Sequence, residues 1–289
     1  MVLSFLKNYF ICIVVYTLLH TSCSENPIKK FSNASTNEAI YEDAMKLYNN
    51  GQFTESIQKF AQLSPQFLNQ REVRFNYAKA LAGKCGYTFI DFISAVSSAN
   101  FGGSNTFFQT LLSLWGNKHV LPTFCTQAEA QVKIIWSQLN SPSERTTSEK
   151  FFMALISLAK MGMYMRVKFD IAENSGLGNG VVDTGVNSCT NSPNPLFFSD
   201  AEIKEIITGF ALFVENLTAI GTALANLSSI TGLTNGLCSY PGVTFCSVTD
   251  AANVTSAQVT QLRKLLRSSS TGLDGVSCVP IIPPDNCCP

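Results

Sequence analysis

The chain has 289 residues, of which 46% are hydrophobic and 14% charged, the composition of a folded protein rather than a disordered one. Lys plus Arg and Asp plus Glu both number 20, so no net charge draws the chain to nucleic acid, whose binding depends on clustered cations. The two histidines are His20, which falls in a predicted targeting segment, and His119, which argues against a histidine-based metal centre or catalytic triad.

Residues 1–22 are predicted to be a signal peptide. Lys7 precedes an apolar run from Tyr9 to Leu19, and small residues follow it. This run is much shorter than the roughly 20 residues that span a bilayer. An uncleaved anchor that also includes the first six residues is the alternative.

The small residues Thr21 and Ser22 stand directly before Cys23. This arrangement resembles a bacterial lipobox, in which the cysteine receives diacylglycerol and becomes the new N-terminus, although His20 stands where that motif usually has leucine. The resemblance implies lipidation of Cys23, a tether over residues 23–35, and a location at the periplasmic face of the outer membrane.

From residue 36 to residue 100 the chain is predicted to form short helices in hairpins. The segment Ser35 to Glu38 is typical of a capping box, and the helix that it opens is expected to end at Gly51. Thr54 is expected to cap the next helix, and Pro65 to end it.

The apolar pattern of this segment recurs with a period of 34 residues: Tyr41, Ala44, Leu47 and Phe53 are matched by Phe75, Ala78, Leu81 and Tyr87. Residues 47–60 resemble a tetratricopeptide repeat, with Ser56 in place of the usual alanine, and in the second copy Cys85 replaces the turn glycine. The resemblance implies stacked hairpins with a groove for peptides or partner surfaces. Alternatively, the hairpins continue a larger helical domain without a free groove.

A helical domain is predicted over residues 101–235. One helix is expected at residues 126–139, a second from a capping box at Thr146 to about residue 172, and the longest from Ser199 to about residue 230. The last is apolar on nearly every face but contains Glu205, which favours a central helix of a bundle over a membrane span.

The segment from Asn179 to Asp183 resembles the second half of a calcium loop of the EF-hand or dockerin type. Asn179 and Asp183 are therefore weak candidate calcium ligands. Leu177 occupies a ligand position and the glutamate expected at the twelfth position is missing, so a glycine-rich loop without an ion is preferred and no cofactor is expected.

Residues 236–289 are predicted to form a cysteine-rich, irregular tail, with a turn closed by Cys238 and Cys246 and a helix capped near Thr255. In an exported chain the remaining cysteines are expected to form disulfides, whose pairing the sequence leaves open. These candidates are Cys85, Cys125, Cys189, Cys238, Cys246, Cys278, Cys287 and Cys288.

The sequence therefore predicts an all-α fold, in which repeat-like hairpins continue into a helical bundle with a disulfide-rich irregular tail. No pattern of catalytic residues is present, and the expected function is that of a lipid-anchored periplasmic binding or scaffold protein. Its expected partners are other envelope proteins or peptides, and not nucleic acid.

Two other classes of protein remain open from the sequence. One is a carboxylate-based envelope enzyme acting on glycans, with Glu129, Glu173 or Glu215 as candidate acids, since such chemistry needs no histidine. The other is a soluble, disulfide-rich secreted protein, which would start at an unmodified residue near Ser24.

Overall fold

The computed structural model describes residues 35–86, 94–95, 106–116, 118–171, 177–183, 187–189, 197–219, 235, 238–239, 243–268, 272–273 and 287–288. Within these ranges the fold is all-α, as predicted. The predicted signal peptide, Cys23 and the rest of the tether as far as residue 34 lie outside the described residues. No helix within the described ranges has the length and apolar character needed to cross a membrane.

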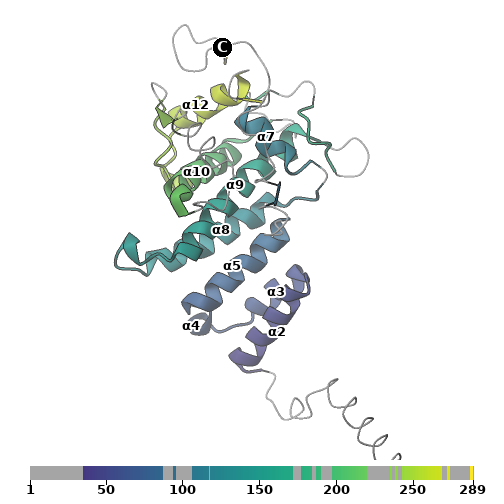
Figure 1. The fold of residues 1–289 in the computed structure, drawn as a ribbon, viewed down its shortest axis with the longest axis vertical. Helices are drawn as coiled ribbons and strands as arrows, with labels where there is room; N and C mark the ends of the chain where they lie inside the picture. The colour runs from purple at the N-terminus through teal and green to yellow at the C-terminus, as the bar shows by residue number, and fades with distance from the viewer. Residues whose placement is uncertain are drawn as a thin grey trace, which may run out of the picture.

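The first two helices, α2 (Asn37–Asn49) and α3 (Phe53–Phe60), form a hairpin (Figure 1). Thr36 caps α2, one residue later than the predicted box begins, and its hydroxyl accepts a hydrogen bond from Ala39 N at 3.2 Å. Two local predictions were wrong. Thr54 lies inside α3 and does not cap it. Pro65 does not end α3 but begins the short helix α4 (Pro65–Leu68). Proline suits this first position because the backbone N–H that it lacks would have no partner within the helix there.

Small side chains allow α2 and α3 to pack closely. Ser56 is completely buried, and its hydroxyl donates a hydrogen bond to the carbonyl oxygen of Ala44 at 2.8 Å. The hydroxyl that distinguishes Ser56 from alanine thus has a partner. Phe60 then stacks on Tyr77, which lies beyond α4 in the helix α5, with 5.2 Å between the ring centroids, and this contact extends a small core from α2 and α3 to α5.

The next helix, α5 (Arg71–Cys85), packs along α8 (Pro122–Ser137). The two helices are antiparallel, because Cys85 at the end of α5 is bonded to Cys125 near the start of α8. The chain between them includes α7 (Phe107–Ser113). Of the last part of the predicted hairpin region, residues 87–93 and 96–100 lie outside the described residues.

A third antiparallel pair consists of α9 (Thr147–Phe169) and α10 (Asp200–Asn216), preceded by a 3-10 turn at Pro142–Glu144. They approach closely at Gly209, where a Cβ atom would lie 2.9 Å from Met161 Cγ. The capping boxes that open α9 and α10 are present as predicted. However, α10 ends at Asn216 and passes into a 3-10 turn at Leu217–Ala219, so the prediction of one helix to about residue 230 was wrong.

The stack ends with α12 (Ser256–Arg267), which follows a 3-10 turn at Ala251–Asn253 and packs on α10 (Figure 1). Its predicted cap is present, with Gln258 N donating to the Thr255 hydroxyl at 3.3 Å. Arg263 of α12 is nearly buried and reaches the start of α10, donating to Phe198 O at 2.9 Å and to Asp200 Oδ1 at 2.8 Å. Helices α2, α3, α5, α8, α9, α10 and α12 thus follow one another along the molecule.

Three disulfides join described cysteines: Cys85–Cys125, Cys189–Cys288 and Cys238–Cys246. Cys287 is also disulfide-bonded, and Cys278 lies outside the described residues. The pair Cys238–Cys246 closes the predicted turn, whereas Cys189–Cys288 connects the loop before α10 to the last residues of the chain.

Candidate functional site

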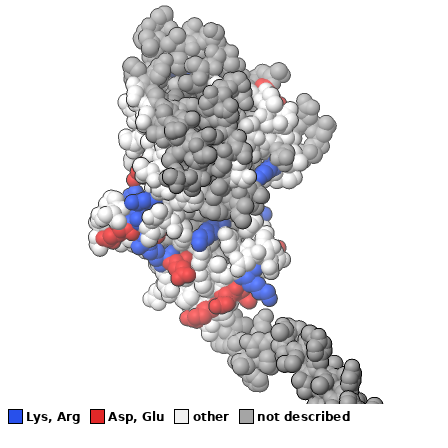
Figure 2. All heavy atoms as spheres, viewed as in Figure 1, with Lys and Arg blue, Asp and Glu red and all other residues white. Residues whose placement is uncertain are grey.

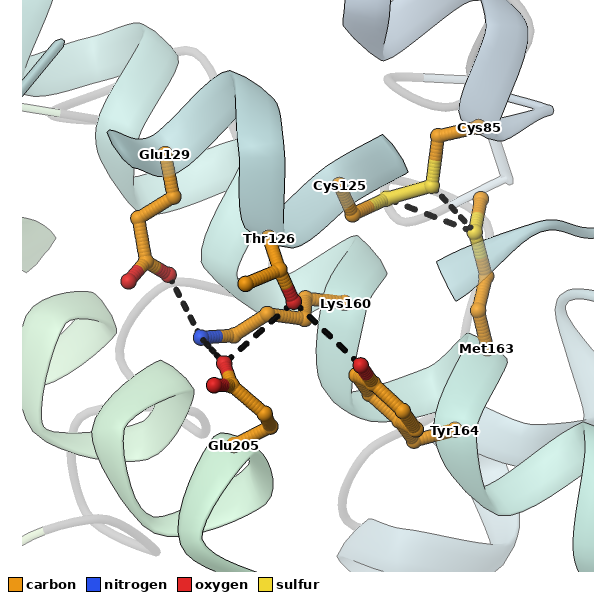
Figure 3. The surroundings of a disulfide bond; sticks show 8 residues. All are labelled: Cys85, Cys125, Thr126, Glu129, Lys160, Met163, Tyr164 and Glu205. Carbon is orange, nitrogen blue, oxygen red and sulfur yellow. Dashed lines mark hydrogen bonds and ion pairs between the residues drawn. A yellow bond between two sulfur atoms is a disulfide. The ribbon is translucent and has the colours of Figure 1, made fainter. Parts of the chain in front are cut away.

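Between α8, α9 and α10 lies a cluster of buried charges (Figure 3). Lys160 of α9 is completely buried, and its Nζ lies 2.7 Å from Glu129 Oε2 of α8 and 2.9 Å from Glu205 Oε2 of α10. The same ammonium donates a hydrogen bond to Thr208 Oγ1 at 3.1 Å. Three successive helices therefore meet at one cation.

The charges of this cluster balance. Lys133 donates to the other oxygen of Glu129 at 2.6 Å and to the carbonyl oxygen of Thr249 at 2.7 Å, so two lysines face two glutamates. Burial by itself lowers the pKa of Lys160, but the carboxylates of Glu129 and Glu205 outweigh it, and the net pKa is raised above its ordinary value. Lys160 is therefore charged in the folded protein.

The two candidate catalytic carboxylates that the structure describes, Glu129 and Glu215, do not come together around a free reaction centre. A general acid or nucleophile must reach the substrate, whereas Glu129 is only 3% exposed and both its oxygens contact lysines. Glu215 lies at the surface and pairs with Arg145 at 2.7 Å. Glu173 lies outside the described residues. The geometry of the Lys160 cluster suits a structural joint.

A second buried carboxylate, Glu149, joins the start of α5 to the turn between α8 and α9. Arg71 binds it twice, from Nε to Oε1 at 2.6 Å and from Nη2 to Oε2 at 2.8 Å. Its Oε2 also accepts from Thr146 N at 3.0 Å and from Trp136 Nε1 at 3.3 Å. Burial raises the pKa of Glu149, but the hydrogen bonds from Arg71 and Thr146 outweigh burial, so the net pKa lies below its ordinary value.

The two candidate calcium ligands direct their oxygens at backbone amides. Asn179 Oδ1 accepts from Val181 N at 2.8 Å, and Asp183 Oδ2 accepts from Ile171 N at 2.5 Å. Among the described residues, no three His, Cys, Asp or Glu side chains are grouped to hold a metal ion. The observed contacts are those of a loop held by its own backbone.

Asp170, which the sequence analysis did not single out, organises this loop. Its carboxylate is almost fully buried at the end of α9 and accepts hydrogen bonds from Asn179 N at 2.7 Å and Gly180 N at 2.8 Å. Gly180 has a φ of +83° and lies against Gly116, where a Cβ atom would come within 2.1 Å of Gly180 N. The loop therefore requires glycine at both positions.

The adjoining sides of α2 and α5 carry partly exposed aromatic, apolar and charged side chains. We call this surface the α2–α5 face, and it consists of Tyr41, Met45, Tyr48, Glu72 and Lys79. Asn76 supports it from beneath, because its amide donates to the Tyr41 hydroxyl at 2.6 Å and its Oδ1 accepts from Lys79 Nζ at 3.0 Å. Lys79 Nζ also lies 4.6 Å from the ring centroid of Phe75. The face is therefore pre-ordered.

Partial burial changes the titration of two side chains on this face. It lowers the pKa of Lys79, an effect that the negative charge of Glu72 opposes. It also raises the pKa of Tyr41, which keeps the Tyr41 phenol neutral and able to donate a hydrogen bond. The α2–α5 face thus offers an ammonium, two phenols, a thioether and a carboxylate.

In the third pair, by contrast, α9 is covered by a helix of the same chain. Gly162 lies against α7 and the turn after it, where a Cβ atom would come 2.5 Å from Trp115 Nε1 and 2.8 Å from Leu111 O. Phe107, Phe108 and Leu112 of α7 are also buried. Residues 152–166 of α9 are all buried, whereas α2 and α5 carry partly exposed aromatic and charged side chains along their adjoining sides.

Among the described residues drawn in colour in Figure 2, positive and negative side chains are interspersed on the face shown.

Comparison of the chain with family models, with curated proteins and with solved structures finds no match.

Proposed function

We propose that this chain is an exported bacterial envelope protein, lipidated on Cys23, that binds other envelope proteins or peptides through the α2–α5 face. The observation that carries the proposal is the pre-ordered row of Tyr41, Asn76 and Lys79, in which each side chain is held by its neighbour. A surface whose side chains are already fixed loses little conformational entropy when a partner binds.

The composition of the face suits a protein partner. Tyrosine and methionine are enriched in protein interfaces, because they bury much apolar area while tyrosine keeps a polar tip. Tyr48 packs on Phe53 with 5.9 Å between the ring centroids, which gives it a fixed orientation. Lys79 and Glu72 add charges of both signs, which favour a partner with both polar and apolar groups.

The tether restricts where such a partner lies. If Cys23 carries the lipid, residues 23–35 reach at most roughly 40 Å from the membrane. The hairpin of α2 and α3, which follows the tether directly, is then the membrane-proximal end of the stack. We therefore place the partner among proteins attached to, or embedded in, the same membrane.

A photo-crosslinking residue in place of Met45 or Lys79, in the native membrane, tests the binding face. The matched control is Gln127, which is exposed on α8. We expect one partner to be captured from positions 45 and 79 and not from position 127. Capture only from position 127, or none from the two test positions, would contradict the proposal.

The anchor is tested by the mass of the N-terminal peptide of the protein extracted from membranes. A diacylated Cys23 supports the tethered protein. An unmodified start near Ser24 refutes the anchor and favours a soluble secreted protein. The remaining alternative is a carboxylate enzyme acting on glycans, and two of its candidate acids already have cationic partners: Glu129 binds Lys160, and Glu215 binds Arg145.

A further inference from the structure

We call α2 with α3 the first hairpin, and α5 with α8 the second hairpin. The Cys85–Cys125 disulfide joins the two helices of the second hairpin at the place where a short turn joins the two helices of the first. In that hairpin α2 and α3 are separated only by Asn50, Gly51 and Gln52, and Gly51 takes a φ of +74°. Cys85 follows Gly51 by one repeat period of 34 residues and ends α5. The chain leaves there and returns at Leu121, whose N donates to Cys85 O at 3.0 Å. A covalent bond thus holds the end of the second hairpin.

This disulfide is buried under α9. Both sulfur-bearing residues are 0% exposed, and Met163 Sδ lies 3.0 Å from Cys85 Sγ and 3.5 Å from Cys125 Sγ (Figure 3). The other two disulfides between described cysteines are different, because all four of their cysteines are partly exposed. We therefore expect thiol reagents to reach those two bonds in the folded protein, but to reach Cys85–Cys125 only after α9 has moved.

We propose that the Cys85–Cys125 disulfide acts as a latch that forms by oxidation during folding. In this proposal α5 pairs stably with α8 only after the disulfide has formed, and α9 then docks over the bond and shields it from reductants. The first hairpin closes across three residues, whereas the second must close across a sequence separation of 40. The entropy lost on closing a loop grows with its length. A cross-link in the unfolded chain therefore stabilises the second hairpin more than it would stabilise the first.

The chemical step is a thiol–disulfide exchange with a disulfide-carrying oxidant. One cysteine thiolate attacks a sulfur of the oxidant and releases one of its thiolates, which leaves a mixed disulfide. The second cysteine thiolate then displaces the remaining half of the oxidant. The two electrons and two protons of Cys85 and Cys125 end on the oxidant as two thiols. Because the native sulfurs are buried, this exchange takes place before α9 docks.

The first test is native-state reduction of the wild-type chain, with alkylation of released thiols and mass mapping over time. We expect Cys238–Cys246 and Cys189–Cys288 to open first, and Cys85–Cys125 to open only when denaturant unfolds the stack. Reduction of all three bonds at equal rates without denaturant would overturn the shielding.

The second test compares the double variant Cys85→Ser/Cys125→Ser with the matched control Cys238→Ser/Cys246→Ser. A cross-link across 40 residues raises the folding equilibrium constant by roughly 700-fold, and one across 8 residues by roughly 60-fold. We therefore expect hydrogen exchange to show lost protection in α5 and α8 of the first variant and retained protection there in the control. Equal protection in the two variants would contradict the latch.

Refolding of the reduced wild-type chain covers the case in which the first variant does not fold. Diluted from denaturant without an oxidant, the chain is expected to leave α5 and α8 unprotected, and addition of a small-molecule disulfide should restore their protection. Full protection before any oxidant is added would refute the requirement for oxidation.

Discussion

Replacing Lys160 by methionine tests whether the buried charge cluster holds the stack together. Methionine keeps most of the side-chain volume but removes the ammonium, so Glu129 and Glu205 would face each other without the cation that lies 2.7 Å and 2.9 Å from them. Removing one partner of a buried ion pair typically costs about 3–5 kcal/mol. Glu129 is 3% exposed, so solvent offers it little compensation, although Lys133 remains in contact with it. We expect a loss within this range.

The measurement is the free energy of unfolding from chemical denaturation. Lys59→Met is the matched control, because Lys59 pairs with Asp43 at 3.4 Å on the surface, where such a pair contributes about 0–1 kcal/mol. Adding Glu129→Gln to Lys160→Met should recover part of the loss, since one uncompensated charge is then removed. A loss for Lys160→Met no larger than that of the surface control would refute the reasoning.

Other predictions concern pH and packing. The pKa of Glu149 is lowered in the folded state. The ionised carboxylate therefore stabilises the folded protein fully above the ordinary glutamate pKa of about 4.3, and this stabilisation is lost as the pH falls through the lower pKa of the folded state. The stability difference between wild type and Glu149→Gln, measured by denaturation from about pH 7 to about pH 2, should therefore shrink toward the acid end; a constant difference would contradict this. Gly162→Ala should destabilise the protein more than Gly51→Ala, because its Cβ meets Trp115 whereas Gly51 has open space and a positive φ that costs about 1 kcal/mol. Equal melting temperatures of these two variants would refute the close packing.

The parts of the fold that the sequence predicts well depend on neighbouring residues. The capping boxes at Thr146, Ser199 and Thr255 each join a hydroxyl to an amide three residues on, so a short stretch contains the whole interaction. Pro65 misled the prediction because proline both ends and begins helices, and the choice depends on whether a cap such as Ser64 precedes it.

The parts that could not be predicted depend on distant contacts. Nothing near Cys85 shows that α8, beyond an excursion of the chain, is the partner of α5. Lys160 is one charge in the apolar run of α9, which signals a buried ion pair, but its partners Glu129 and Glu205 stand on other helices. Of the α2–α5 face, only Tyr41 was among the repeat positions of the sequence, and its contact with Asn76, which also binds Lys79, emerges only in three dimensions.

The position of α7 limits how long a segment of the proposed partner the stack could bind. With α9 covered, the α2–α5 face is two helices wide, and packed helices lie about 8–10 Å apart. An extended peptide crossing both helices spans roughly 20 Å, which is about six residues at their usual rise. For the partner proposed above, this footprint would match a short linear motif rather than a whole domain, and the affinity of one such contact would be modest. Attachment of both proteins to one membrane would compensate for this by raising the local concentration of the motif.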